Sequence, residues 1–281
     1  MPVIVPKSLE SALAALTAYP DATVLAGGTD LMVEVNDGRR PLTRVVAVGR
    51  VPELTGIRVD GATVVIGAAA TFAQLERDPV ADLVPALAYA ARTVGSPQIR
   101  NAATIGGNLA TASPAGDALP VLVALGASVE IAGKNGRRLV PIADFFTGPK
   151  RSVLDPGELV VAVQVPVLRG PQDYLKVGVR NAMVIAVASL AIAVDLEAPR
   201  VGIGLGSVGP TPLDAPEACS WVASRARWRS DGVEVTDEDV VEFGERVAGA
   251  ARPIDDHRGT ARYRRHAVSV LARRALRRCT R

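Results

Sequence analysis

The amino-acid sequence predicts an α+β protein made of three successive parts. Each of the first two parts mixes short apolar runs, typical of strands, with amphipathic runs at the helical period, and is predicted to form a small α/β subdomain. The third part begins at Tyr174 with three apolar runs that suit an antiparallel sheet, and three helical patterns follow. With 281 residues, 48% apolar and 22% charged, the chain can bury a substantial core.

The first subdomain is predicted over residues 1–55. Ser8 can cap a helix whose apolar residues Leu9, Leu13 and Leu16 share one face, and a strand over 23–26 should follow. The remaining predicted elements are a turn at Gly27-Gly28, a short helix over 31–35 and a strand over 44–48.

The second subdomain is predicted over residues 56–168. Its clearest signal is Asn135-Gly136, the dipeptide that tight hairpin turns prefer, placed between strands at 128–132 and 138–140. Residues 169–173 are predicted to be a linker. The other predicted elements are a strand over 64–66, helices over 71–77, 84–94 and 119–125, and a strand over 158–165.

The third part is predicted to be an antiparallel sheet with one face of side chains, which helices then cover. The predicted strands run over 174–179, 186–195 and 201–207. The predicted helices run over 216–225, 237–250 and 260–278.

Metal chemistry is not expected on this chain. Its cysteines are Cys219 and Cys279 and its histidines are His257 and His266, too few for an iron–sulfur cluster or a zinc site of His and Cys. Any metal of the system should therefore be held by another chain. Two buried, inert thiols are expected rather than a disulfide, and His257, beside Asp255-Asp256 and Arg258, is expected in a surface turn.

Positive charge gathers at the C-terminus. Residues 258–281 hold nine arginines and no carboxylate, so removing them from the formal charge of +3 leaves residues 1–257 at −6. Because apolar residues interleave with these arginines at helical spacing, a packed amphipathic helix is expected, and nucleic-acid binding is not. No apolar run is long enough to span a bilayer, and the protein is expected to be cytoplasmic.

Three common catalytic or nucleotide-binding signatures are absent or fail in context. Gly204 to Gly209 matches the spacing of a dinucleotide fingerprint, but Pro210 and Pro212 follow where a helix should begin, so glycines lining a packed sheet are expected there. The sequence has no Gly-Lys-Ser or Gly-Lys-Thr phosphate loop and no GxSxG nucleophile motif. Nucleotide hydrolysis and serine hydrolase chemistry are therefore excluded.

Two glycine-centred segments remain, at residues 24–31 and 104–108. Paired glycines let the backbone approach a ligand closely and aim successive N–H groups at an anion, so together the segments could clamp a diphosphate. Asp117 follows the second segment, in a loop with Ser113 and Gly116. Its carboxylate could hold ribose hydroxyls, or it could cap the helix predicted over 119–125.

These features together resemble the FAD-binding subunit of the molybdenum hydroxylase family, over nearly the whole chain and in order. The xanthine dehydrogenase FAD-binding subunit is the nearest type, and the carbon monoxide dehydrogenase medium subunit is related. The matching segments are 24–31 (VLAGGTDL), 97–101 (PQIRN), 104–108 (TIGGN), 113–117 (SPAGD), 146–150 (FTGPK), 156–160 (PGELV), Lys176 with Arg180, 255–258 (DDHR) and 263–265 (YRR).

The resemblance implies a PCMH-type FAD-binding domain over residues 1–168 and a C-terminal domain over 173–281, like that of the carbon monoxide dehydrogenase flavoprotein. Both glycine segments would wrap the diphosphate of FAD, and Asp117 would lie near its ribose. The FAD contacts that it implies are Val24, Leu25, Ala26, Gly27, Gly28, Thr29, Asp30, Leu31, Thr104, Ile105, Gly106, Gly107, Asn108, Asp117, Val160 and Lys176. Val94 stands where some relatives place an aromatic residue, so the side chain that covers the flavin is not identified.

The function implied is electron transfer within a heterotrimeric oxidoreductase. A molybdopterin-binding large subunit would oxidise a purine or an aldehyde, and an iron–sulfur small subunit with [2Fe-2S] clusters would relay electrons to FAD on this chain, which would pass them to NAD or another acceptor. No residue of this chain is expected to act as a catalytic acid, base or metal ligand. The alternatives are the flavin subunit of a carbon monoxide or aldehyde dehydrogenase, and a non-catalytic assembly protein that keeps the FAD fold.

Overall fold

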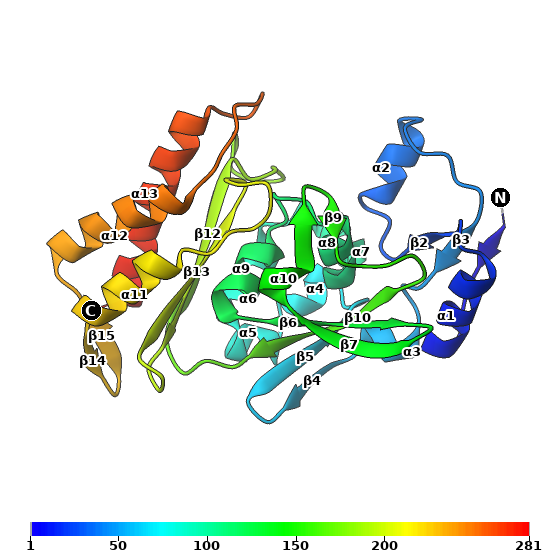
Figure 1. Ribbon diagram of the computed structural model, residues 1–281, viewed down its shortest axis with the longest axis horizontal. Coiled ribbons are helices and arrows are strands. Elements are labelled where there is room, and N and C mark those ends of the chain that lie inside the picture. Colours follow the sequence, from blue (N-terminus) through cyan, green and yellow to red (C-terminus); the bar gives the residue numbers. More distant parts are fainter. Residues whose placement is uncertain (1, 281) are drawn as a thin grey trace.

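The computed structural model describes residues 2–280 and shows three parts in a row (Figure 1). The N-terminal subdomain lies at one end, and the C-terminal sheet with its helices lies at the other. The second subdomain lies between them and contacts both, so it connects the two ends of the molecule.

The N-terminal subdomain is a parallel sheet in the order β1-β3-β2 with α1 packed on β3. The predicted cap is present: Ser8 Oγ accepts the Ser11 N–H (3.1 Å), and Ser11 Oγ accepts the Ser8 N–H (3.0 Å). This reciprocal capping fixes where the helix begins. Its elements are β1 (Val3–Ile4), α1 (Leu9–Ala18), β2 (Thr23–Leu25), α2 (Leu31–Asn36), β3 (Val45–Ala47) and α3 (Pro52–Thr55).

The second subdomain is built on an antiparallel sheet in the order β4-β5-β10-β6-β7, with the helices α4 to α9 forming most of the remaining core. The predicted hairpin is present: Lys134 and Asn135 form the turn between β6 and β7, and Gly136, with φ +103°, is the first residue of β7. Its elements are β4 (Ile57–Asp60), β5 (Thr63–Gly67), α4 (Phe72–Leu75), α5 (Val80–Leu83), α6 (Pro85–Arg92), α7 (Pro97–Ala102), α8 (Ile105–Thr111), α9 (Ala118–Leu125), β6 (Ser128–Gly133), β7 (Gly136–Pro141), α10 (Ile142–Phe145), β8 (Phe146–Gly148), β9 (Arg151–Ser152) and β10 (Leu159–Pro166).

The C-terminal part is an antiparallel sheet in the order β11-β12-β13, with α11 and α13 packed on its outer face and α12 packed against these two helices. The predicted helices over 216–225 and 237–250 are confirmed with these bounds, and the amphipathic C-terminal helix is also confirmed. Its elements are β11 (Gln172–Val177), β12 (Ala188–Asp195), β13 (Arg200–Gly206), α11 (Pro216–Arg225), β14 (Arg227–Arg229), β15 (Gly232–Glu234), α12 (Asp237–Ala250) and α13 (Ala261–Cys279).

Both faces of this sheet are buried, whereas the sequence predicted one covered face. Along β12, Leu190 and Ile192 face the helices of the C-terminal part, while Ala191 and Ala193 join the core of the second subdomain. Helix α9 packs on this second face, across β13 and β12. Small side chains permit that approach: a Cβ on Gly204 would overlap the carbonyl oxygen of Pro120. The glycines at 204–209 therefore belong to a packed sheet, as predicted, and not to a nucleotide fingerprint.

Two further expectations change in the structure. Gln172 and Asp173 are buried in β11, so the predicted linker is shorter than 169–173. The second glycine segment is not a loop, because α8 begins inside it, at Ile105. His257 is exposed in a turn that Asp256 closes, as predicted.

The remaining expectations concern the cysteines, membrane-spanning helices and metal sites. Cys219 and Cys279 are both buried and free, and burial raises the pKa of each thiol to about 12. Within residues 2–280, no helix is long and apolar enough to cross a membrane. The same residues contain no group of three or more His, Cys, Asp or Glu placed to hold a metal ion.

Candidate functional site

A cavity of about 780 Å³ opens where the three parts of the molecule meet. Pockets of this size hold cofactor-sized ligands. Of the residues predicted to contact a cofactor, all line it except Ile105 and Lys176. Those that line it are Val24, Leu25, Ala26, Gly27, Gly28, Thr29, Asp30, Leu31, Thr104, Gly106, Gly107, Asn108, Asp117 and Val160.

The first glycine segment provides unpaired backbone donors. From Gly27 to Leu31, five consecutive N–H groups donate no hydrogen bond to another residue of the described chain. The Asp30 side chain, at the N-cap position of α2, does not cap the helix either. Successive free N–H groups on a concave surface attract an anion. This run is therefore the part of the cavity best suited to a diphosphate.

The two glycines of this segment are required for different reasons. A Cβ on Gly27 would overlap the carbonyl oxygen of Ala102, so only glycine lets the segment pack against the end of α7. Gly28 has φ +73°, in the left-handed region that glycine adopts at little cost. Together they hold the run of donors against the second subdomain.

The second glycine segment was predicted to aim its backbone N–H groups at a ligand, but in the structure these groups bond to other residues of the chain. The Ile105 and Gly106 N–H groups donate to the Ala70 and Ala68 carbonyls (3.0 and 2.8 Å), and the Gly107 N–H donates to Thr104 Oγ1 (3.0 Å). Because the Asn108 N–H also donates, to the Thr104 carbonyl (3.0 Å), this backbone has few donors left for a ligand. The sequence missed the helix because glycine pairs are poor helix formers, whereas Thr104 caps this one.

Asn108 contributes its side chain instead. It lies in α8 and lines the cavity, and its Oδ1 atom is buried with no hydrogen-bond partner in the described chain. A buried acceptor without a partner is costly, so a ligand that brings a hydroxyl or amino donor would be stabilised there.

Asp117 has a role that neither sequence hypothesis anticipated. It occupies the N-cap position of α9 but makes no capping bond. Its Oδ1 accepts the Tyr174 hydroxyl (2.7 Å), and its Oδ2 accepts the Lys176 ammonium (2.8 Å). The Lys176 ammonium also donates to the Thr93 carbonyl (3.2 Å). This cluster ties β11 to the second subdomain: Asp117 lines the cavity, whereas Tyr174 and Lys176 lie outside the lining.

Burial controls the electrostatics of this cluster. The Asp117 and Lys176 side chains are only 10% and 7% exposed. Burial raises the pKa of Asp117, and the nearby ammonium and hydroxyl oppose that shift. Burial and the Asp117 carboxylate hold the pKa of Tyr174 well above 10. Lys176 is thus committed to a neighbouring carboxylate and does not offer a free cation to the cavity.

The cations that do line the cavity were not among the predicted contacts. Lys150 donates to Glu34 (2.8 Å), and Arg40 lies 3.6 Å from the same carboxylate. The hydrogen bond and the charge of Lys150 lower the pKa of Glu34, and burial opposes them. Residue 150 stands in a segment that carried the resemblance, which was the available signal, whereas nothing singled out Arg40. Since both cations share one acidic partner, the backbone donors remain the main anion-binding feature.

The apolar part of the lining comes from segments distant in sequence. Val94, Leu154 and Val160 supply part of it, and the segment between β11 and β12 adds Met183, Val184 and Ile185. Met183 and Ile185 are 56% and 52% exposed. An apolar wall and a row of N–H groups in the same cavity suit a ligand with a flat ring system at one end and a diphosphate further along. Within the described lining, no nucleophile is paired with a histidine base, since both histidines lie elsewhere.

Comparisons with known proteins agree with this chemistry. The family described as the FAD binding domain in molybdopterin dehydrogenase matches residues 1–168. The CO dehydrogenase flavoprotein C-terminal domain matches residues 173–279.

Individual relatives cover almost the whole chain. The glyceraldehyde dehydrogenase medium chain of Sulfolobus acidocaldarius is 34% identical, over 96% of this chain and 94% of the relative. The xanthine dehydrogenase FAD-binding subunit of Escherichia coli O157:H7 is 28% identical, over 96% and 92%. A chain in the crystal structure of a cyanide-inactivated Cu,Mo-CO dehydrogenase superposes with a TM-score of 0.90 at 31% identity, over 99% and 97% of the two chains.

The cavity fits the cofactor of this family. FAD has a diphosphate for the five free N–H groups, hydroxyls for Asn108 Oδ1 and a planar ring for the apolar wall. The resemblance found in the sequence is confirmed, as are the fold, the FAD cofactor and the role as an oxidoreductase subunit. The chain therefore belongs to the family of FAD-binding subunits of the molybdenum-hydroxylase-type dehydrogenases.

Proposed function

We propose that this chain holds FAD with its diphosphate against the N–H groups of Gly27 to Leu31 and its ring against the apolar wall near Val160 and Met183. The observation that carries the proposal is the run of five consecutive unpaired N–H groups beside a cofactor-sized cavity. Bound there, FAD supplies two-electron chemistry that side chains cannot perform.

The residues of the two glycine segments have distinct tasks in this proposal. Residues 24–31 face the cofactor directly, and Asn108 accepts a hydrogen bond from one of its hydroxyl or amino groups. Thr104, Ile105, Gly106 and Gly107 pack and cap α8, which holds Asn108 in place. Asp117 lines the cavity, and its ion pair with Lys176, which lies outside the lining, holds this part of the wall in place. The chain thus binds, orients and partly shields the flavin, and no side chain has to move a proton.

Partners follow from the names of the relatives. Medium chains and FAD subunits are parts of larger enzymes, so we propose a complex with a molybdopterin-binding large subunit and an iron–sulfur small subunit that carries [2Fe-2S] clusters. The related enzymes are named for glyceraldehyde, xanthine and carbon monoxide. These names do not single out xanthine, which we retain as one candidate. NAD is the acceptor that we propose to test first.

The test is a titration of the cofactor-free chain with FAD and, separately, with FMN, followed by flavin fluorescence. We expect FAD to bind tightly and FMN much more weakly, because FMN lacks the diphosphate that the N–H groups would bind. Equal affinity for the two flavins, or no binding of FAD, would contradict the proposal. Recovery of the same partner subunits with and without FAD, with no flavin retained in the complex, would favour the assembly-protein alternative.

A further inference from the structure

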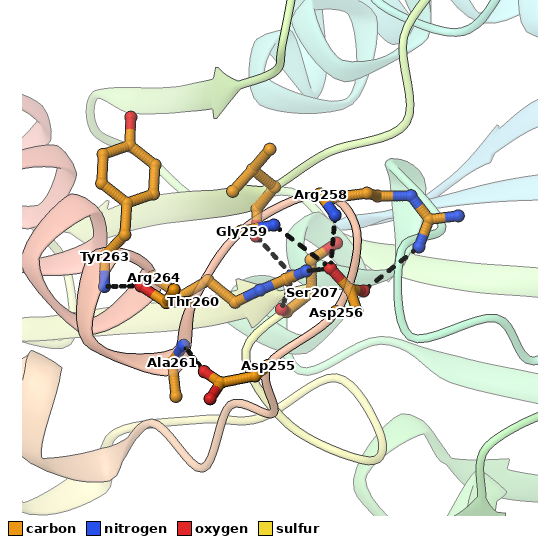
Figure 2. A network of polar contacts seen from close by, with 10 residues as sticks. Ser207, Asp255, Asp256, Arg258, Gly259, Thr260, Ala261, Tyr263 and Arg264 are labelled. Atoms are coloured by element: carbon orange, nitrogen blue, oxygen red, sulfur yellow. Dashed lines mark hydrogen bonds and ion pairs between the residues drawn. The ribbon is translucent and has the colours of Figure 1, made fainter.

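Arg264, at the start of α13, is a guanidinium buried behind the cavity. The residue is 3% exposed. Its Nη1 donates to the carbonyls of Val187 and Ser207, both at 2.7 Å, and its Nη2 lies 2.6 Å from Asp256 Oδ1 (Figure 2). Burying an arginine is costly unless its donors are paired. The guanidinium is therefore stable at this position only while its three acceptors keep their places.

The first acceptor closes the segment that forms one wall of the cavity. Val187 follows Met183 to Ile185, which line the cavity, and its N–H donates to the Val177 carbonyl (2.8 Å) at the end of β11. Among residues 2–280, the Arg180 side chain hydrogen-bonds only to the carbonyls of Ala182 and Met183, within its own segment. It therefore does not attach the segment to the rest of the described molecule. Arg264 thus holds the base of an otherwise exposed segment.

The second acceptor leads to another segment of the cavity lining. Ser207 follows β13 in a left-handed conformation, with φ +62°, which is strained for a residue other than glycine. Its N–H donates to the Pro114 carbonyl (2.8 Å), and the neighbours Ser113 and Ala115 line the cavity. One guanidinium therefore fixes two segments that face the cavity from different domains.

The third acceptor orients the guanidinium. Asp256 Oδ1 also accepts the N–H groups of Arg258 (2.8 Å) and Gly259 (3.2 Å), so its turn is rigid (Figure 2). Burial opposes the ionisation of Asp256, but the Arg258 N–H and the Arg264 guanidinium outweigh it and lower the pKa of the carboxyl. A planar fork can bond two carbonyls and a carboxylate at once, which the single nitrogen of lysine does poorly.

We infer that Arg264 is a positioning residue for the flavin: by holding the Val187 and Ser207 carbonyls, it sets the separation of the 183–185 wall from the 113–117 wall. This inference rests on the proposed function, because it assigns the cavity to FAD. Arg264 does not line the cavity, so it acts through the two backbone segments alone.

The test compares Arg264→Lys with two matched variants of the same helix. Arg264→Lys keeps the charge beside Asp256 but lacks the fork. Val268→Ala removes buried methyl groups from α13 at a residue that does not line the cavity, and it controls for a general loss of stability. Arg262→Lys controls for the exchange of arginine at an exposed position. The readouts are the Kd for FAD, the visible circular dichroism of bound flavin and hydrogen exchange of the FAD-free chain at the Val187 and Ser207 amides.

For Arg264→Lys we expect a Kd for FAD at least about tenfold higher than that of Val268→Ala, with an altered flavin dichroism. We also expect exchange about tenfold faster at the two amides, because the carbonyl groups of these same two residues lose the guanidinium that holds them. Arg262→Lys should match the wild type in every readout. Should Arg264→Lys not fold, Asp256→Asn carries the same test with a smaller shift in the same direction.

A Kd and a dichroism of Arg264→Lys that match those of Val268→Ala would overturn the positioning role and leave the proposed function standing. Unchanged exchange at both amides would overturn it as well. A wild-type chain that binds no FAD would overturn both this inference and the proposed function, so the two failures are distinguishable.

Discussion

Breaking the buried ion pair between Asp117 and Lys176 should destabilise the junction between the two domains. Lys176→Met leaves the Asp117 carboxylate with the Tyr174 hydroxyl as its remaining side-chain partner. Because both charged side chains are at most 10% exposed, the loss should be that of a buried pair, about 3–5 kcal/mol in the free energy of unfolding. An exposed pair would contribute only about 0–1 kcal/mol.

The stability loss caused by Lys176→Met is predicted to change with pH in a definite direction. Burial already raises the pKa of Asp117 above 3.8, and removing the ammonium should raise it further. A carboxyl with a raised pKa in the folded state is stabilising in its protonated form, so that contribution is full below the unfolded pKa and is lost as pH rises through the folded pKa. The loss in the free energy of unfolding caused by Lys176→Met should therefore be small near pH 4 and grow toward neutral pH.

The assay is urea unfolding of the wild type, the two single variants and the double variant Asp117→Asn/Lys176→Met. The double variant removes both charges, so it should lose clearly less than the sum of the single variants, with a coupling of roughly 2–3 kcal/mol. Its affinity for FAD should stay near the wild-type value if Lys176 only supports the wall. Additive single effects below about 1 kcal/mol would refute the buried pair, and loss of FAD binding by the stable double variant would show that Asp117 or Lys176 contacts FAD directly.

Three further predictions concern groups outside this cluster. The thiols of Cys219 and Cys279, with pKa raised to about 12, should react slowly with a thiol reagent at neutral pH and rapidly after denaturation. Asp256→Asn should lower the Tm at neutral pH, and because the pKa of this carboxyl is lowered, the difference from wild type should shrink as pH falls below about 4. Gly204→Ala should cost about 1–3 kcal/mol or more in urea unfolding, because its Cβ would meet the Pro120 carbonyl.

Each of these three predictions would be contradicted by a specific result. Fast labelling of the native thiols would show that they are accessible. A Tm difference for Asp256→Asn that persists at low pH would mean that ionisation of the carboxyl is not what stabilises the turn. Gly232→Ala, where no atom lies within 4 Å of the added Cβ, is the control for Gly204→Ala, and equal effects would contradict the packing of α9 on β13.

Local patterns predicted helices and strands well wherever the sequence contains capping or turn residues. Ser8 and Ser11 form the cap that the helical run required, and Asn135-Gly136 forms its hairpin. The helix over 237–250 has its predicted bounds because Thr236 caps a strongly amphipathic run. Such signals depend on neighbours within a few residues, so the sequence alone contains them.

The predictions that changed depended on contacts distant in sequence. The second glycine segment became helical because its N–H groups find the Ala68 and Ala70 carbonyls and a threonine cap. Asp117 bonds to side chains of β11, which no local pattern reveals. Arg40 reaches the cavity through an ion pair with a residue of α2, and it carried no motif. The ligand was recognisable from the two glycine segments taken together with the other matching segments along the chain, whereas the way in which the cavity walls are supported required the fold.

The central claim is that the backbone N–H groups of the first glycine segment bind the diphosphate of FAD. The most direct test is the Kd for FAD of Gly27→Ala, whose Cβ would overlap the Ala102 carbonyl and displace the segment. Gly170→Ala is the matched control, because it meets the Val194 carbonyl in a similar way and lies outside the cavity lining. Losing two or more hydrogen bonds to a charged group should weaken FAD binding by Gly27→Ala at least about a hundredfold, with Gly170→Ala near wild type. A folded Gly27→Ala chain that binds FAD as tightly as the wild type would contradict the claim.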